Sequence, residues 1–229
     1  GRLIEHIRGF CTERGWPHGD LNMPRPFATE KAFPENEAVV TTTFARGEGR
    51  AVSSQFLYEH RVGRRGQYEI FVRDVDEVGG AYKHVLFDNH RTGSIFSGGG
   101  EIKAQSGGPV FEAFATLSQT LSLIPLMKDG FLHAHVGIEA PANAESGAKE
   151  AFWRLAIGKS FMQQTWGRAW SPMVEFLAAR NLETGAENEW DVLPQVQVSL
   201  STRQHVLLSA GVRFPVTQRS ARNTSVLVY

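Results

Sequence analysis

Residues 190–216 read WDVLPQVQVSLSTRQHVLLSAGVRFPV and contain two segments in which apolar and polar side chains alternate. Period-two alternation is a strand pattern, because successive side chains of a strand point to opposite faces. Residues 202–204 separate the two segments, so the stretch predicts an antiparallel hairpin. A turn centred on Arg203 places Val198 opposite Leu208, which gives both strands one shared apolar face.

Similar alternating segments recur upstream of this hairpin. They lie at residues 38–45, 52–60, 67–75, 81–88, 91–102, 110–121, 130–140, 150–161 and 168–180. No helical period recurs between them, so hairpin connections and an antiparallel up-and-down meander are expected. A long meander must close, because open strand edges invite aggregation. We predict an all-β, antiparallel up-and-down barrel of about ten to twelve strands.

Alternation alone fits both a soluble barrel or sandwich with an apolar interior and a transmembrane barrel with a polar lumen. Strands of about 10 residues match a tilted membrane span, whereas about 5–6 residues is the norm in soluble proteins. Aromatic residues also gather near the predicted strand ends, where interfacial girdles lie: Trp153, Trp166, Trp170, Trp190, Phe161, Phe214 and Tyr229. These features favour a transmembrane-type barrel in contact with membrane lipid. A soluble ligand-binding β-barrel is the alternative.

The N-terminal part of the chain has a different character. Apolar residues at helical spacing predict a short amphipathic helix over 3–14. The following stretch contains four prolines, which forbid a regular ladder: Pro17, Pro24, Pro26 and Pro34. The sequence therefore predicts a helix within residues 1–14, a Pro-rich linker over 15–37 and a barrel over 38–229. We expect the helix and the linker to lie in the periplasm.

The polar faces of the strands predict the lumen. The polar residues expected to face it are Arg154, Glu175, Gln195, Gln197, His205 and Arg213. If the turn within 161–168 is centred between Gln164 and Thr165, Arg154 lies directly across from Glu175. This register predicts a salt-bridged, narrow interior rather than a wide channel.

Candidate chemical sites are few. His133 and His135 share one strand face at a spacing that metal pairs use, but a lumen-facing polar pair is the more ordinary interpretation. An enzyme inside the lumen, the third functional alternative, needs a clustered Ser or Cys, His and acid. The sequence shows no such set, so no catalytic residue and no enzymatic activity are predicted. The 24 Lys and Arg balance the 24 Asp and Glu, which argues against a nucleic-acid partner.

Two phrases carry a family resemblance. Residues 19–42, GDLNMPRPFATEKAFPENEAVVTT, and the hairpin 190–216 resemble bacterial proteins in which a c-type cytochrome domain precedes an outer-membrane β-barrel. That barrel is similar to the transporter family named for the MetA pathway of phenol degradation. The stretch IEHIRGFC, residues 4–11, looks like the final helix of the cytochrome.

The resemblance implies a location in the bacterial outer membrane. It also implies a transport or porin-like pore, or a membrane anchor for a periplasmic c-type cytochrome or another electron-transfer partner. The lone Cys11 cannot form the Cys-x-x-Cys-His attachment motif, so no cofactor is expected in this chain. Haem c is expected in an upstream domain.

Overall fold

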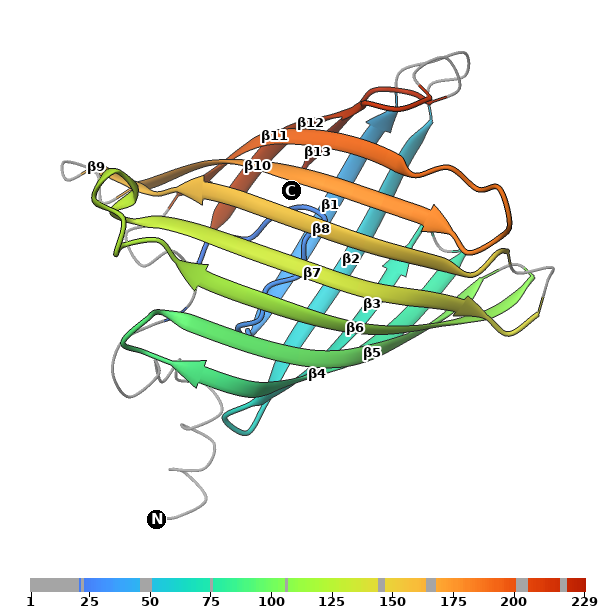
Figure 1. The fold of residues 1–229 in the computed structure, drawn as a ribbon, viewed down its shortest axis with the longest axis horizontal. Coiled ribbons are helices and arrows are strands. Elements are labelled where there is room, and N and C mark those ends of the chain that lie inside the picture. Colours follow the sequence, from blue (N-terminus) through green and yellow to red (C-terminus); the bar gives the residue numbers. More distant parts are fainter. Residues whose placement is uncertain are drawn as a thin grey trace.

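The fold is a closed antiparallel β-barrel with a short segment of chain inside it (Figure 1). The computed structural model describes Leu21 and residues 23–45, 51–74, 76–105, 107–143, 147–163, 168–200, 206–218 and 222–229. The predicted helix within residues 1–14 lies outside the described residues.

The strands follow one another around the wall in chain order. They are β1 (Glu37–Ala45), β2 (Val52–Val62), β3 (Gly66–Arg73), β4 (Glu77–Asn89), β5 (Ser94–Gln105), β6 (Gly108–Thr120), β7 (Gly130–Pro141), β8 (Glu150–Lys159), β9 (Phe161–Gln163), β10 (Arg168–Asn181), β11 (Glu189–Ser199), β12 (Leu207–Pro215) and β13 (Ser225–Val228). A single 3-10 turn, η1 (Pro125–Met127), lies between β6 and β7 in the described chain. Among the described residues, no helix has the length and apolar character that a membrane span requires.

Two pairings close the ring. β13 pairs with both β12 and β1, although it has only 4 residues. β10 pairs with β11 on one side and with β8 on the other. The short β9 continues the line of β8 and pairs with the start of β10, so the wall consists of twelve strands. The predicted all-β antiparallel barrel is confirmed.

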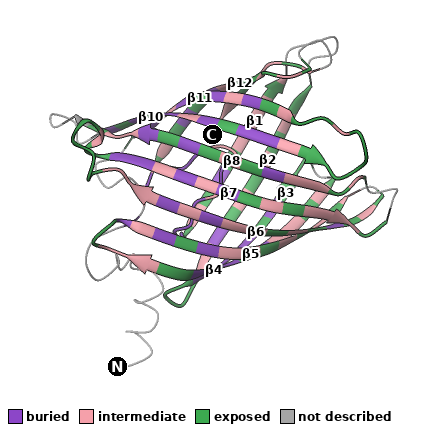
Figure 2. Ribbon diagram, in the orientation of Figure 1, coloured by how far each residue is buried: buried purple, intermediate pink, exposed green. Residues whose placement is uncertain are grey.

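Burial alternates along each strand, as Figure 2 shows. On β10 the outward Trp170 and Phe176 are exposed, whereas the inward Ser171 and Glu175 are buried. This inverts the pattern of a soluble protein, because the apolar side chains lie outside and the polar ones inside. The barrel therefore has an apolar outer wall and a polar interior.

The strand registers test two sequence-based predictions. Val198 pairs with Leu208, so the register predicted for the opening hairpin is confirmed. The register predicted for the next hairpin upstream is wrong, because Arg154 pairs with Leu177 and Glu175 pairs with Ala156. The observed pairs are offset by two residues from the predicted ones, so Arg154 and Glu175 remain on the same inner face.

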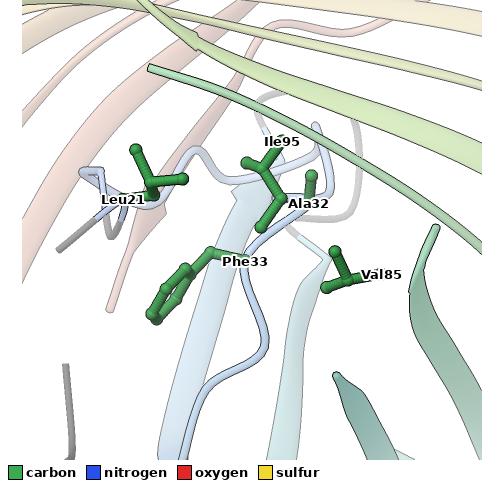
Figure 3. Close-up of a cluster of buried hydrophobic side chains, with 5 residues drawn as sticks. All are labelled: Leu21, Ala32, Phe33, Val85 and Ile95. Atoms are coloured by element: carbon green, nitrogen blue, oxygen red, sulfur yellow. The ribbon is translucent and has the colours of Figure 1, made fainter. Parts of the chain in front are cut away.

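The structure places much of the predicted linker inside the barrel. Residues 23–36, here called the inner segment, run within the ring of strands and appear dark blue in Figure 1. Leu21 packs with two residues of the inner segment and two of the wall in a buried cluster (Figure 3): Ala32, Phe33, Val85 and Ile95. The sequence-based expectation placed this stretch in the periplasm, whereas the structure shows that residues 23–36 lie within the ring of strands. Its polar and charged groups find partners on the inner wall.

The path of the inner segment is a loop. Leu21 packs beside Phe33, so the incoming and outgoing limbs lie close together. Lys31 Nζ also donates a hydrogen bond to Met23 O, at 3.2 Å, across the two limbs. The outgoing limb ends beside the β2–β3 turn, where Arg61 N donates to Asn36 Oδ1 at 2.9 Å. The inner segment therefore enters and leaves through the same end of the barrel.

The observed β8–β10 register predicts which cysteine pair can be crosslinked. Directly opposite residues have Cβ atoms about 4.5–5.5 Å apart, whereas diagonal neighbours are about 7–8 Å apart. In a Cys11→Ser background, Trp153→Cys with Ala178→Cys should therefore form a disulfide on oxidation. Trp153→Cys with Phe176→Cys is the matched control, because these two residues would be directly opposite only in the register predicted from the sequence. Preferential crosslinking of the control pair, measured by mass spectrometry, would contradict the register.

Candidate functional site in the barrel interior

The interior is built from polar side chains that the strands direct inward. The largest fully buried polar or charged side chains come from seven strands: Glu59, Gln67, Lys83, Ser97, Thr116, Ser118, His133 and Glu175. A buried polar group is costly unless it is hydrogen-bonded, and a buried charge must be paired. In this barrel, the inner segment supplies partners for most of these groups.

Arg25 is the central cation of the inner segment. Its guanidinium binds the Glu59 carboxylate of β2 through two hydrogen bonds of 2.7 Å each, and it also donates to Glu37 at 3.1 Å. Bidentate, charge-assisted pairs of this kind are the strongest protein hydrogen bonds. The Arg25 carbonyl accepts from Tyr229 at 2.9 Å, which ties the same residue to the C-terminal end of the wall.

Glu175 of β10 binds the tip of the inner segment, residues 27–29. It lies nearly across the ring from Glu59 of β2. Its carboxylate accepts hydrogen bonds from the backbone N–H groups of Phe27, Ala28 and Thr29 and from the Thr29 hydroxyl, with closest distances of 2.7 Å. Successive backbone N–H groups that converge in this way form an anion-binding nest. Gln195 Nε2 also donates to Glu175. The tip therefore wraps around one buried carboxylate of β10.

The outgoing limb is held by a line of side chains from β4, β5 and β6. Lys83 forms an ion pair with Glu30 and donates to the Lys31 carbonyl at 2.8 Å. Ser97 donates to the Ala32 carbonyl at 2.6 Å, and Ala32 N donates to Ser118 Oγ at 3.0 Å. No backbone–backbone hydrogen bond links the inner segment to a strand among the described residues. The barrel therefore holds this segment as it would hold a ligand, through side chains.

Glu35 lies within this charge network and outside the strands. It forms ion pairs with Lys31 and, at 3.6 Å, with Arg25. Burial raises the pKa of the Glu35 carboxyl to about 7, and the neighbouring Lys31 opposes the rise. The positions of Glu35, Arg25 and Lys31 show that charge compensation begins within the segment itself.

A cavity of about 580 Å³ lies in the lumen beside the inner segment. Pro26, Phe27 and Ala28 line it at the tip of the inner segment. Aromatic rings lie flat against its wall where the adjacent strand has a glycine. A Cβ on Gly137, for example, would lie 2.4 Å from the Phe152 ring. The missing side chain leaves room for the ring at the wall and keeps the cavity open.

Four glutamates form one row across the cavity wall on β5–β8. Glu101 pairs in register with Glu112, Glu112 with Glu139, and Glu139 with Glu150. Lys103 compensates part of this charge through an ion pair with Glu139 at 2.9 Å. Elsewhere on the wall, Asp191 binds both Arg213 and Arg222. The cavity is therefore strongly polar and suits water, ions and small polar solutes.

The structure gives a position to most residues predicted to face the lumen. Arg154 lies at the cavity, where it donates to the Ala28 carbonyl at 2.9 Å and stacks over Phe152. Gln195 and Gln197 are buried and contact Glu175 and the Arg25 carbonyl, respectively. Arg213 binds Asp191, as described above, and His205 lies outside the described residues. The predicted Arg154–Glu175 pair is wrong, because each residue binds the inner segment instead.

The histidines predicted as a weak metal pair bind protein groups. His133 Nε2 lies 3.1 Å from the Pro24 carbonyl and Nδ1 lies 2.7 Å from Ser118 Oγ, so Nε2 donates and Nδ1 accepts. His135 Nδ1 accepts from Glu30 N at 3.4 Å. The groups of possible ligands that converge among the described residues contain only carboxylates: Glu30, Glu59 and Glu69, and Glu35, Glu37 and Glu59. Arg25, Lys31 and Lys83 already compensate these carboxylates.

The sequence analysis did not identify the residues whose ion pairs hold the inner segment in the lumen. These are Arg25 and Glu30 on the inner segment and Glu59 and Lys83 on the wall. Two signals were available: the predicted linker alternates charges with prolines, and β2 and β4 each carry an ionisable residue on the lumen-facing side. Ionisable groups inside a membrane protein are rare and need a partner, so they point to something inside the lumen.

Glu175→Gln should destabilise the folded barrel by roughly 1–3 kcal/mol, because an amide cannot satisfy the converging N–H groups as a carboxylate does. Unfolding by urea in lipid vesicles, followed by tryptophan fluorescence, measures the loss. Glu183→Gln on the exposed β10–β11 loop is the matched control and should change stability by less than about 0.5 kcal/mol. Equal stability of both variants would show that the tip does not depend on Glu175.

Among known proteins, this chain is similar to solved structures. No protein-family model and no curated protein matches the sequence. A solved structure of the NanC porin is similar with a TM-score of 0.61 at 9% identity, over 84% of this chain and 97% of that chain. The KdgM porin is similar with a TM-score of 0.52 at 12% identity, over 82% of this chain and 95% of that chain. At these identities the likeness shows the fold, and the chain has the twelve-stranded antiparallel barrel fold of these porins.

Proposed function

We propose that this chain is an outer-membrane pore for small polar solutes and ions. The observation that carries the proposal is a polar lumen with a cavity of about 580 Å³ inside an apolar outer wall. A transmembrane β-barrel has this arrangement, because lipid surrounds the apolar band and water fills the lumen. The likeness to two porin structures supports the same function.

The outer wall supports the membrane location. Large apolar side chains are exposed on strands all around the ring, such as Phe56, Phe111, Phe176 and Leu208. A contiguous apolar surface of this kind is unusual on a soluble monomer and marks contact with another apolar phase. The alternative of a soluble ligand-binding barrel requires these residues to face inward, where the structure places Glu59, Glu112 and Ser209 instead.

The arrangement at Ser118 and His133 gives the enzyme alternative little support. The Ser118 hydroxyl contacts His133 Nδ1 as a nucleophile–base pair does, but both residues are completely buried. Ala32 N also donates to the Ser118 oxygen, so the inner segment covers the pair. The contacts of this pair serve to hold the segment.

The family resemblance supports a second, finer proposal. We propose that the barrel belongs to the MetA-pathway-like transporters and that in its native gene it follows a c-type cytochrome domain, which it anchors in the periplasm. Haem would be bound there, and a periplasmic electron-transfer protein would be the partner. Reading the native gene upstream of the codon for Gly1 tests this. A gene that lacks a Cys-x-x-Cys-His motif upstream contradicts the proposal.

Tryptophan quenching tests the membrane orientation. In a background whose native tryptophans are replaced by phenylalanine, Leu208→Trp on the outer face should be quenched by brominated lipid. Leu57→Trp, which lines the cavity, is the matched control and should be quenched by aqueous acrylamide instead. A stable barrel in plain buffer, with the residue 208 probe reached by acrylamide, would contradict the membrane location.

Planar-bilayer recording tests the pore. Thr41 faces the cavity and its neighbour Thr42 faces outward, so cysteines at these positions form a matched pair in a Cys11→Ser background. Each is labelled with a bulky thiol reagent in detergent before reconstitution. The label on Thr41→Cys should reduce the ion current, because it occupies the lumen, whereas the label on Thr42→Cys should not. Equal currents from both labelled proteins would place the conducting path outside the lumen.

A further inference from the structure

This inference rests on the proposed pore function and concerns its regulation. We infer that the inner segment is a displaceable plug, and that the carboxylates of Glu175 and Glu59 hold it in the closed position. The two carboxylates lie on β10 and β2, nearly opposite one another in the ring. Together they fix the tip and the central cation of the segment.

The topology permits displacement without threading. Both limbs of the inner segment leave the barrel at one end, as the packing of Leu21 on Phe33 shows. A loop can be withdrawn through the opening it entered, whereas a chain threaded from end to end cannot. The strands of the wall need not separate, because no described backbone hydrogen bond joins the segment to them.

The chemistry of the contact surface also suits a reversible closure. Beside two small apolar clusters, the segment and the wall meet through charged groups on both sides, such as Arg25 with Glu59 and Glu30 with Lys83. Water can solvate all of these groups when they separate. The free energy of such pairs is a small difference between desolvation and attraction, so their separation costs less than the exposure of an apolar core.

Glu175 is the contact whose loss affects the tip most directly. It holds three successive N–H groups and one hydroxyl, and two of the residues that it holds, Phe27 and Ala28, line the open cavity. Arg154 holds the tip through one further bond, to the Ala28 carbonyl. Release of Glu175 removes most of these bonds, so the tip can move more easily toward water at the cavity or out of the barrel. The closed position therefore depends on this carboxylate.

Single-channel recording of the full chain tests the plug. Glu175→Gln should raise the open probability about tenfold, which corresponds to a loss of about 1.4 kcal/mol from the closed state. Glu183→Gln, the exposed control, should conduct as the wild type does. Thr29→Val removes only the hydroxyl bond to Glu175 and should give a smaller increase, which keeps the test informative if Glu175→Gln does not fold.

A covalent lock tests the same inference independently. In a Cys11→Ser background, Thr29→Cys with Glu175→Cys replaces a side-chain contact of 2.7 Å with a pair that oxidation or a short thiol crosslinker can join. The crosslinked protein should stay closed. The reduced protein should conduct more than the wild type, because its carboxylate is gone.

The outcomes separate this inference from the pore itself. Folded barrels that carry no current in the wild type, in Glu175→Gln and in the reduced double variant would overturn the pore function, and the plug with it. Current that is the same in wild type, Glu175→Gln and both states of the double variant would overturn the plug alone. A heat-dependent gel shift confirms that each variant is folded before recording.

Discussion

Charge compensation inside a closed apolar wall is the constraint on which this structure depends. The outer faces of the strands are apolar, so the polar residues that alternate with them must point inward. Ionisable groups such as Glu59, Lys83 and Glu175 are fully buried there, and a buried charge is tolerated only when it is paired and hydrogen-bonded. The inner segment supplies the countercharges and donors. While the segment is seated, its charges and those of the wall therefore compensate one another.

The alternation of side chains predicted the wall well, because it follows directly from strand geometry. It located every long strand in the described part of the chain. It also gave the register of the opening hairpin. The β8–β10 register was wrong because alternation fixes only the face of a residue. An offset of two residues preserves every face and changes every pair, so Glu175 lies opposite Ala156 rather than Arg154.

The position of the inner segment could not be predicted in the same way. Its prolines predict a segment without a regular ladder, and residues 23–36 contain neither helix nor strand. Whether such a segment lies outside the barrel or inside it depends on which charges meet after closure. That information is distributed over Glu59, Lys83, His133 and Glu175, which lie on four strands far apart in sequence. No local pattern of the segment encodes the contact with Glu175, because it is made by backbone N–H groups that every non-proline residue has.

The same constraint explains why the inner segment leaves a cavity in the lumen. The row from Glu101 to Glu150 places like charges on directly opposed residues of neighbouring strands, which is destabilising unless water or cations screen them. The cations of the inner segment are already engaged, with Arg25 on Glu59 and Lys31 on Glu35. A chain segment packed against the row without further cations would remove its water and compensate none of its charge. Charge compensation therefore favours water over further chain beside the glutamate row.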